Sequence, residues 1–435
     1  MLTLSVRQDG YSAFGQKYPW AEFPSAAVGW VFPQEPFFKA NWLNYGKLRL
    51  SYGVNGNRDI GRYSALSNLA TGKYLEVNPD GTTSIVSQLY VTQMANEDLK
   101  WERTAAFNLG LDFSMLHNRI GGSIDVYQGK TTNLLVNRSL PDVVGFANVQ
   151  SNLGEVDNKG LEIGLTSTNI DHRNFRWTSS FNFSLNRNKI AHLYGNMVDV
   201  KDANGNVIGQ QEASDIPNKW FIGHPIDAVW DLKVLGVYQS GDKDQAAVYG
   251  QSPGDFKLQD VNGDGKYTND DRQFIGFGKP RFQWTLRNDF TFFKNFDFSF
   301  LIYSKWGNMS PFNQAKNRGG FPDRTNGYVY PHWTPDHPTT DFARIFSSDG
   351  SASYNVYRKL DFIRLDNISI AYILPRSFIN KASIQDFKVY FSVRNVGFYA
   401  PDWDNWDPEW DPGAVLNPGP GPTPRTYTLG FNLTL

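Results

Sequence analysis

The acidic segment from residue 260 to residue 271 has the spacing of a calcium-binding loop. Its side-chain oxygen donors occupy positions 1, 3, 5, 9 and 12 of the twelve-residue pattern: Asp260, Asn262, Asp264, Thr268 and Asp271. Gly265 allows the sharp turn at position 6, and Lys266 offers a backbone carbonyl at position 7. Position 12 is Asp instead of Glu, so its carboxylate extends less far toward the ion. No helix pattern flanks the segment. We therefore predict a structural calcium ion that pins a long loop; the alternative is a solvated cluster of Asx turns.

A second cluster near the C-terminus combines tryptophan with acidic residues. Its members are Trp403, Asp404, Trp406, Asp407, Glu409 and Trp410. Indole faces stack on the C–H faces of sugar rings, while carboxylates accept hydrogen bonds from sugar hydroxyls. The cluster therefore predicts a glycan-contacting loop, and Arg318, Asp323 and Arg324 are further candidate substrate contacts. The alternative is that these tryptophans pack against neighbouring loops.

Covalent chemistry has little support in the sequence. Two carboxylates can hydrolyse a glycosidic bond only at a defined separation, which the sequence does not give. No Ser-His-Asp signature, phosphate loop or nucleotide fingerprint is present. His332 and His337 flank Asp336, but loop histidines without a helix to align them are usually solvated rather than metal-bound. We predict no enzymatic activity and no catalytic residues.

All these residues lie between segments that alternate strictly between apolar and polar side chains. In the last ten residues, Tyr427, Leu429, Phe431, Leu433 and Leu435 point one way and the intervening polar residues point the other. The same period-two pattern recurs at 2–6, 47–54, 107–113, 120–126, 161–165, 175–185, 282–292, 296–302, 368–373 and 387–393. About a dozen strands are predicted by this pattern, and no helix pattern competes.

The connections between these strands are of two kinds. Tight turns are predicted at 117–119, 171–174 and 294–295, and long loops rich in Gly, Pro, Asn and Asp cover 55–98, 191–279, 307–353 and 396–424. A compact soluble domain rarely carries several such loops. Short turns at one rim and long loops at the other are typical of an outer-membrane barrel. We predict an all-β fold: an antiparallel transmembrane β-barrel with long extracellular loops.

The composition is consistent with this fold and narrows the possible partners. The 435 residues include 15% aromatic residues, which suits the aromatic girdles of a barrel. No apolar run approaches the roughly 20 residues that a membrane helix needs. A formal net charge of -1 gives no positive field for nucleic acid, so nucleic acid is excluded as a partner. The absence of cysteine excludes disulfides and thiolate metal sites.

Several segments, in order and spacing, resemble one protein family over nearly the whole chain. They are SVRQDGYSAFG, FPSAAVGWVF, LRLSYGVNGN, LKWERTAAFNLGLDF, NLGEVDNKGLEIGL, DFIRLDNISIAYILP, NWDPEW and PRTYTLGFNLTL. Together they resemble the barrel half of the SusC/RagA family of TonB-linked outer-membrane proteins. The resemblance implies a partial barrel, with about a dozen strands of a 22-stranded whole.

The resemblance also implies a function, partners and a location. The expected function is active import of nutrients, with oligosaccharides favoured over peptides, beneath a SusD-like surface lipoprotein. TonB, ExbB and ExbD would act through a plug, and the location would be the outer membrane of a Gram-negative, Bacteroidota-like cell. The alternative function is that of a secreted or surface β-rich protein that binds glycans or cleaves glycosides.

The chain departs from the family pattern at both ends. Residues 1–435 are expected to be the C-terminal part of the barrel domain, without a signal peptide, plug or early strands. Leu435 stands where the family usually ends in an aromatic residue. An open sheet would leave unpaired edges in lipid, where each unsatisfied backbone group costs several kcal/mol. We therefore expect further strands to complete the barrel.

Overall fold

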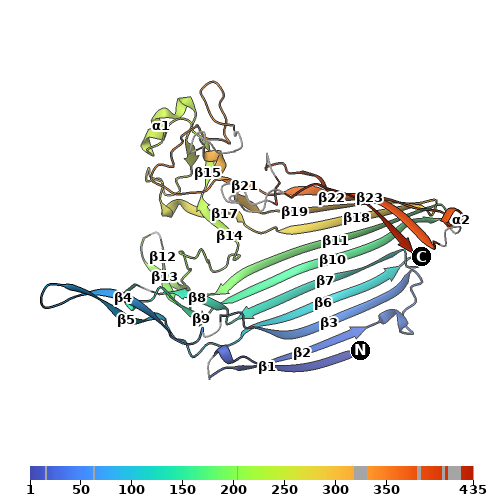
Figure 1. The fold of residues 1–435 in the computed structure, drawn as a ribbon, viewed down its shortest axis with the longest axis horizontal. Helices are drawn as coiled ribbons and strands as arrows, with labels where there is room; N and C mark the ends of the chain where they lie inside the picture. Colours follow the sequence, from blue (N-terminus) through green and yellow to red (C-terminus); the bar gives the residue numbers. More distant parts are fainter. Residues whose placement is uncertain are drawn as a thin grey trace. The chain divides into compact units, whose positions relative to one another are not determined.

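A single large antiparallel sheet dominates the computed structural model. The structure describes residues 1–14, 17–61, 64–140, 142–202, 204–317, 331–379, 384–403, 407–409 and 423–434. In this described part, the sheet has 12 strands, ordered β1-β2-β3-β6-β7-β10-β11-β18-β19-β22-β23-β24 (Figure 1). Their bounds are β1 Leu2–Gly10, β2 Trp20–Trp30, β3 Leu43–Asn57, β6 Glu102–Met115, β7 Ile120–Thr132, β10 Glu155–His172, β11 Phe175–His192, β18 Phe282–Phe292, β19 Phe296–Trp306, β22 Phe362–Ile373, β23 Asp386–Tyr399 and β24 Thr426–Thr434. The predicted number and type of strands are confirmed.

The apolar side chains of the sheet are not covered by a second layer. Leu50 is 43% exposed, Leu109 42% and Val126 50%, although all three lie on central strands. On β24, Leu429 is 76% exposed. A β-sandwich would bury these residues between two sheets. Their exposure therefore excludes a sandwich and leaves one face of the sheet apolar and open.

Tight turns join several of the strands as the sequence predicts. Leu116, His117 and Asn118 adopt left-handed backbone conformations, with φ of 55°, 58° and 63°, between β6 and β7. Phe293 and Lys294, with φ of 52° and 68°, do the same between β18 and β19. Left-handed turn residues match the right-handed twist of the flanking strands and so keep these hairpins short.

The long connections contain secondary structure that the sequence pattern does not show. Within the described residues they carry six two-stranded ribbons: β4 Asn68–Val77 with β5 Thr83–Gln93, β8 Leu135–Ser139 with β9 Asn148–Asn152, β12 Met197–Lys201 with β13 Val207–Glu212, β14 Ala228–Leu232 with β17 Arg272–Phe277, β15 Val234–Val237 with β16 Phe256–Leu258, and β20 Met309–Pro311 with β21 Tyr357–Lys359. Two short helices, α1 (Lys243–Val248) and α2 (Arg376–Ile379), also occur. Helices of six and four residues are too short to produce a helical period in the sequence. No helix in the described part is long and apolar enough to cross a membrane.

The chain divides into two compact units. The first comprises Met1–Asn118, Ser123–Glu162 and Asn186–Ile226, and the second comprises Arg119–Gly122, Ile163–Leu185 and Asp227–Leu435. In the second unit, the connections share an apolar core, which we call the loop core. Its buried members include Leu232, Phe256, Phe312, Trp333 and Trp403. The long connections of this unit therefore fold together instead of extending separately into solvent.

Candidate functional site

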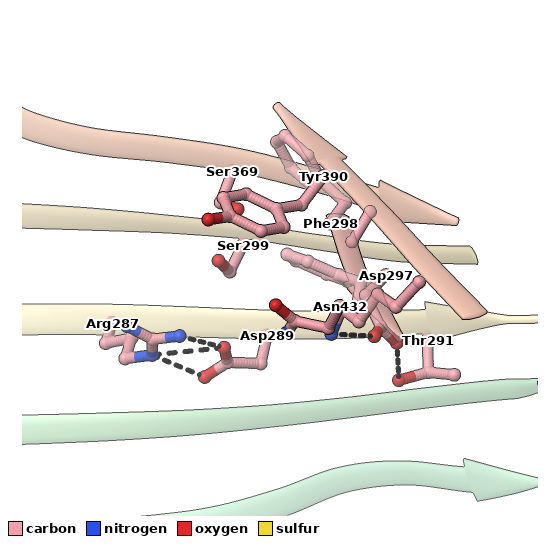
Figure 2. Close-up of a pocket in the computed structure, with 12 residues that line it drawn as sticks. Arg287, Asp289, Thr291, Asp297, Phe298, Ser299, Ser369, Tyr390 and Asn432 are labelled. Carbon is pink, nitrogen blue, oxygen red and sulfur yellow. Dashed lines mark hydrogen bonds and ion pairs between the residues drawn. The ribbon is translucent and has the colours of Figure 1, made fainter. Parts of the chain in front are cut away.

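The polar face of the sheet in the second unit forms a hollow of about 460 Å³, which we call the polar wall. It is lined by Arg287, Asp289, Phe290, Thr291, Asp297, Phe298, Ser299, Ser369, Ala371, Lys388, Tyr390 and Asn432 (Figure 2). These residues come from β18, β19, β22, β23 and β24, which are consecutive in the sheet. The strand register places Asp289 opposite Ser299, and Ser299 opposite Ser369. Strand alternation therefore gathers polar groups from distant parts of the sequence on one surface.

The charged groups of the polar wall are already paired. Arg287 forms a fork on Asp289, with its Nε 2.9 Å and its Nη2 2.6 Å from the carboxylate oxygens. The Lys388 ammonium lies 3.2 Å from Asp297, and the Thr291 hydroxyl donates to the same carboxylate at 3.0 Å. The four groups are two cations and two carboxylates, so their net charge is zero. Because their side chains are 35–49% exposed, each pair contributes only about 0–1 kcal/mol to stability.

The tyrosine of the polar wall needs a glycine opposite it. Tyr390 on β23 pairs with Gly430 on β24. A Cβ at residue 430 would lie 2.5 Å from the Tyr390 hydroxyl oxygen, which is closer than Cβ atoms come to other heavy atoms. Gly430 thus gives the aromatic ring space to lie across the neighbouring strand and to keep its hydroxyl in the hollow.

Two described members of the aromatic-acidic cluster are buried inside the protein. Trp403 is 1% exposed and belongs to the loop core, where its ring meets that of Phe312 edge-on at 5.3 Å. Asp407 is 4% exposed and accepts a hydrogen bond from the Arg364 guanidinium. The packing alternative thus describes the position of Trp403. A substrate-binding role for Trp403 and Asp407 stays a prediction.

Glu409 contacts strands of the large sheet and so holds the segment that contains Asp407 against it. It accepts hydrogen bonds from the Tyr303 hydroxyl and from Lys305 Nζ, the latter at 2.7 Å, and it lies 3.1 Å from Arg364 Nε. Arg364 is 1% exposed, and its guanidinium lies 5.2 Å from the centre of the Phe398 ring. The acidic residues therefore hold their segment against strands β19 and β22. The other predicted contacts lie outside the described residues: Arg318, Asp323, Arg324, Asp404, Trp406 and Trp410.

The predicted calcium loop runs from β16 toward β17, without α-helices on either side. Its residues are Asp260, Asn262, Asp264, Lys266, Thr268 and Asp271. Asp260 accepts hydrogen bonds from the Gly263 amide at 2.6 Å and from the Gly265 amide at 3.0 Å. Asp271 accepts hydrogen bonds from the amides of Val261 and Thr268, each at 2.8 Å. The loop thus has the turn geometry expected from the Asx alternative.

These contacts affect the acidity of the loop without deciding whether it binds calcium. Partial desolvation would raise the pKa of Asp260, but hydrogen bonds from Gly265, Gly263 and Tyr249 outweigh it and hold the pKa below its usual value. Among the described residues, no three His, Cys, Asp or Glu side chains form a group that could hold a metal ion. Calcium stays a prediction.

Sequence reasoning did not identify the polar wall. The sequence does contain a signal, because Arg287, Asp289 and Asp297 occupy the polar positions of the alternating segments 282–292 and 296–302. What the sequence lacks is the pairing of strands. Lys388 reaches Asp297 across 91 residues, and only the order of strands in the sheet shows that the two side chains meet.

Comparisons with known proteins agree on one family. The model of the family described as "TonB dependent receptor-like, beta-barrel" matches residues 1–221. TonB-dependent receptor P3 of Formosa agariphila is 32% identical over 449 residues, which cover 100% of this chain and 44% of that protein. TonB-dependent receptor SusC of Bacteroides thetaiotaomicron is 29% identical over 446 residues, covering 100% of this chain and 42% of that protein.

A solved structure shows the same fold. The structure of the RagAB peptide transporter matches with a TM-score of 0.76 at 23% identity, covering 99% of this chain and 45% of that one. The chain therefore spans less than half the length of each of these relatives.

Proposed function

Because the chain belongs to the TonB-dependent receptor family, we propose that it forms part of the wall of an outer-membrane importer that takes up nutrients at the expense of TonB-transmitted energy. The chain is an outer-membrane barrel segment, and its family consists of transporters rather than enzymes. The observation that carries the proposal is the division of one sheet into an open apolar face and a polar face with paired charges. Hydrocarbon solvates the first face and water solvates the second.

The polar wall has the chemistry of a route for a polar solute. Its hydroxyl, amide and paired charged groups can exchange hydrogen bonds with a passing molecule, and none of its four charges is left uncompensated. A neutral or zwitterionic solute suits such a surface. We propose that solute selection takes place in the long connections, where the loop core holds several segments together.

The proposed substrate is an oligosaccharide. The support is the other tryptophan and acidic residues after residue 400, Asp404, Trp406 and Trp410, because these residue types bind sugar rings. Trp403, Asp407 and Glu409 are engaged in contacts within the protein. Peptide is the other substrate class, because the similar solved structure is that of a peptide transporter. The proposed partners are a SusD-like surface lipoprotein, which would cover the long connections, and TonB with ExbB and ExbD, which would act through a plug.

Uptake measurements test the proposal. A strain that lacks the gene is expected to lose accumulation of a labelled oligosaccharide, and re-expression of the gene should restore it. Loss of TonB, or collapse of the proton gradient, should abolish the same uptake. Labelled peptides of similar mass serve as the matched comparison. Uptake that continues without TonB would refute active import, and uptake of peptide alone would refute the oligosaccharide assignment.

A further inference from the structure

In the first unit, the apolar face of three neighbouring strands gives way to charged side chains. Val126 on β7 and Leu161 on β10 belong to the apolar face. Every second residue lies on this face, and we follow it on each strand toward the end that carries the longer connection. On β10 and β11 the next positions on that face are charged, and on β7 Gln128 comes first and Lys130 follows it. The three strands are adjacent in the sheet (Figure 1). We call this group the basic belt: Lys130, Glu155, Asp157, Lys159, Arg187 and Lys189.

Two ion pairs show that the belt residues share one face. Lys130 Nζ lies 2.7 Å from a carboxylate oxygen of Glu155, which joins β7 to β10. Lys189 Nζ lies 3.8 Å from a carboxylate oxygen of Asp157, which joins β11 to β10. The side chains of Lys130 and Lys189 are both 54% exposed. The belt is therefore a continuous surface that crosses three strands.

The belt carries more positive than negative charge. Lys130 and Lys189 pair with its two carboxylates, so the positive charge of Lys159 is not balanced within it. Lys159 is exposed and has no carboxylate within ion-pair distance among the residues that the structure describes. Exposed ammonium groups on long stems can extend from an apolar surface toward an anionic layer.

The position of the belt identifies the anionic layer. The apolar face below it lies in hydrocarbon, so the belt is at the level where the lipid headgroups begin. The ends with long connections face outward from the cell, where the headgroups of a Gram-negative outer leaflet are phosphorylated sugars. We propose that the basic belt binds the phosphate groups of this outer-leaflet glycolipid. A soluble anionic partner fits less well, because the belt is continuous with the lipid-facing surface.

Lipid titration tests the proposal directly. The complete receptor in phosphatidylcholine nanodiscs would be titrated with bis-phosphorylated lipid A, with binding measured by native mass spectrometry. Replacement of Lys130, Lys159 and Lys189 together by Gln should weaken binding roughly a hundredfold, because cations near an anionic surface attract it additively. Dephosphorylated lipid A should bind the wild type and this variant equally weakly. Substrate uptake by the variant should not change, which separates this proposal from the proposed function.

Two further variants control for net charge and for misfolding. Lys73, Lys100 and Lys243 are exposed lysines outside the belt, and their joint replacement by Gln removes the same charge but should leave binding unchanged. Replacement of Glu155 by Gln with Asp157 by Asn should strengthen binding, because it removes the negative charges of the belt. Equal binding by the wild type and the belt-lysine variant would overturn the proposal. So would equal losses in the control, or no gain in the carboxylate variant.

Discussion

The buried contact between Arg364 and Asp407 should determine how firmly the Asp407 segment is held against the sheet. Arg364 is 1% exposed and Asp407 is 4% exposed, so neither charge is well solvated. Replacement of Asp407 by Asn leaves the guanidinium buried, with Glu409 as its remaining carboxylate. Breaking a buried pair costs about 3–5 kcal/mol, and the remaining carboxylate places the expected cost at about 3 kcal/mol. That cost corresponds to a roughly hundredfold rise in local opening.

Hydrogen exchange of peptides covering residues 400–409 measures this opening. The matched control is Asp289→Asn, which also removes a carboxylate from an arginine pair, but one whose side chains are 49% and 41% exposed. The control should change local opening by less than about 1 kcal/mol. If Asp407→Asn accelerates exchange no more than the control does in its own segment, the inference that burial makes this contact strong is wrong.

The remaining predictions concern the two faces of the sheet, the calcium loop and the polar wall. Leu109→Arg should destabilise the protein in lipid by about 2–4 kcal/mol, because it places a charge in hydrocarbon, whereas Asn108→Arg on the polar face should cost less. The stability of the two variants can be compared by heat-modifiability on gels. Equal losses of stability would contradict the assignment of the two faces. Calcium should slow proteolysis of the 260–271 loop in the wild type but not in Asp260→Asn, and a wild type indifferent to millimolar calcium would remove the calcium prediction. Gly430→Val should cost about 1–3 kcal/mol through its clash with Tyr390, and the additional change Tyr390→Ser should recover much of that cost; no recovery would show that the clash is not the cause.

The large sheet could be predicted from the sequence because its physical requirement is local. A strand with one face in hydrocarbon and the other in water must alternate at every second residue, and β24 does so along its whole length. The turns are also local, since the residues that adopt left-handed conformations, such as Asn118, lie between two alternating segments. The sequence therefore contained most of the information needed to assign the strands.

The loop core could not be predicted, because its contacts are distant in sequence and have no period. Phe312 and Trp403 meet across 91 residues, and neither lies in an alternating segment. A tryptophan beside carboxylates has the same local sequence whether it binds a sugar or packs in a core. Only its burial, at 1% exposure, distinguishes the two positions.

The compensated charges of the polar wall have a consequence for transit. A site that binds a solute strongly by electrostatic attraction also releases it slowly. An unpaired charge on the surface would therefore slow the passage of an oppositely charged solute. Arg287 with Asp289, and Lys388 with Asp297, present opposite charges side by side, so their fields cancel beyond a few ångströms. A solute moving past them meets shallow, interchangeable sites, and changes of ionic strength should scarcely alter how fast it leaves.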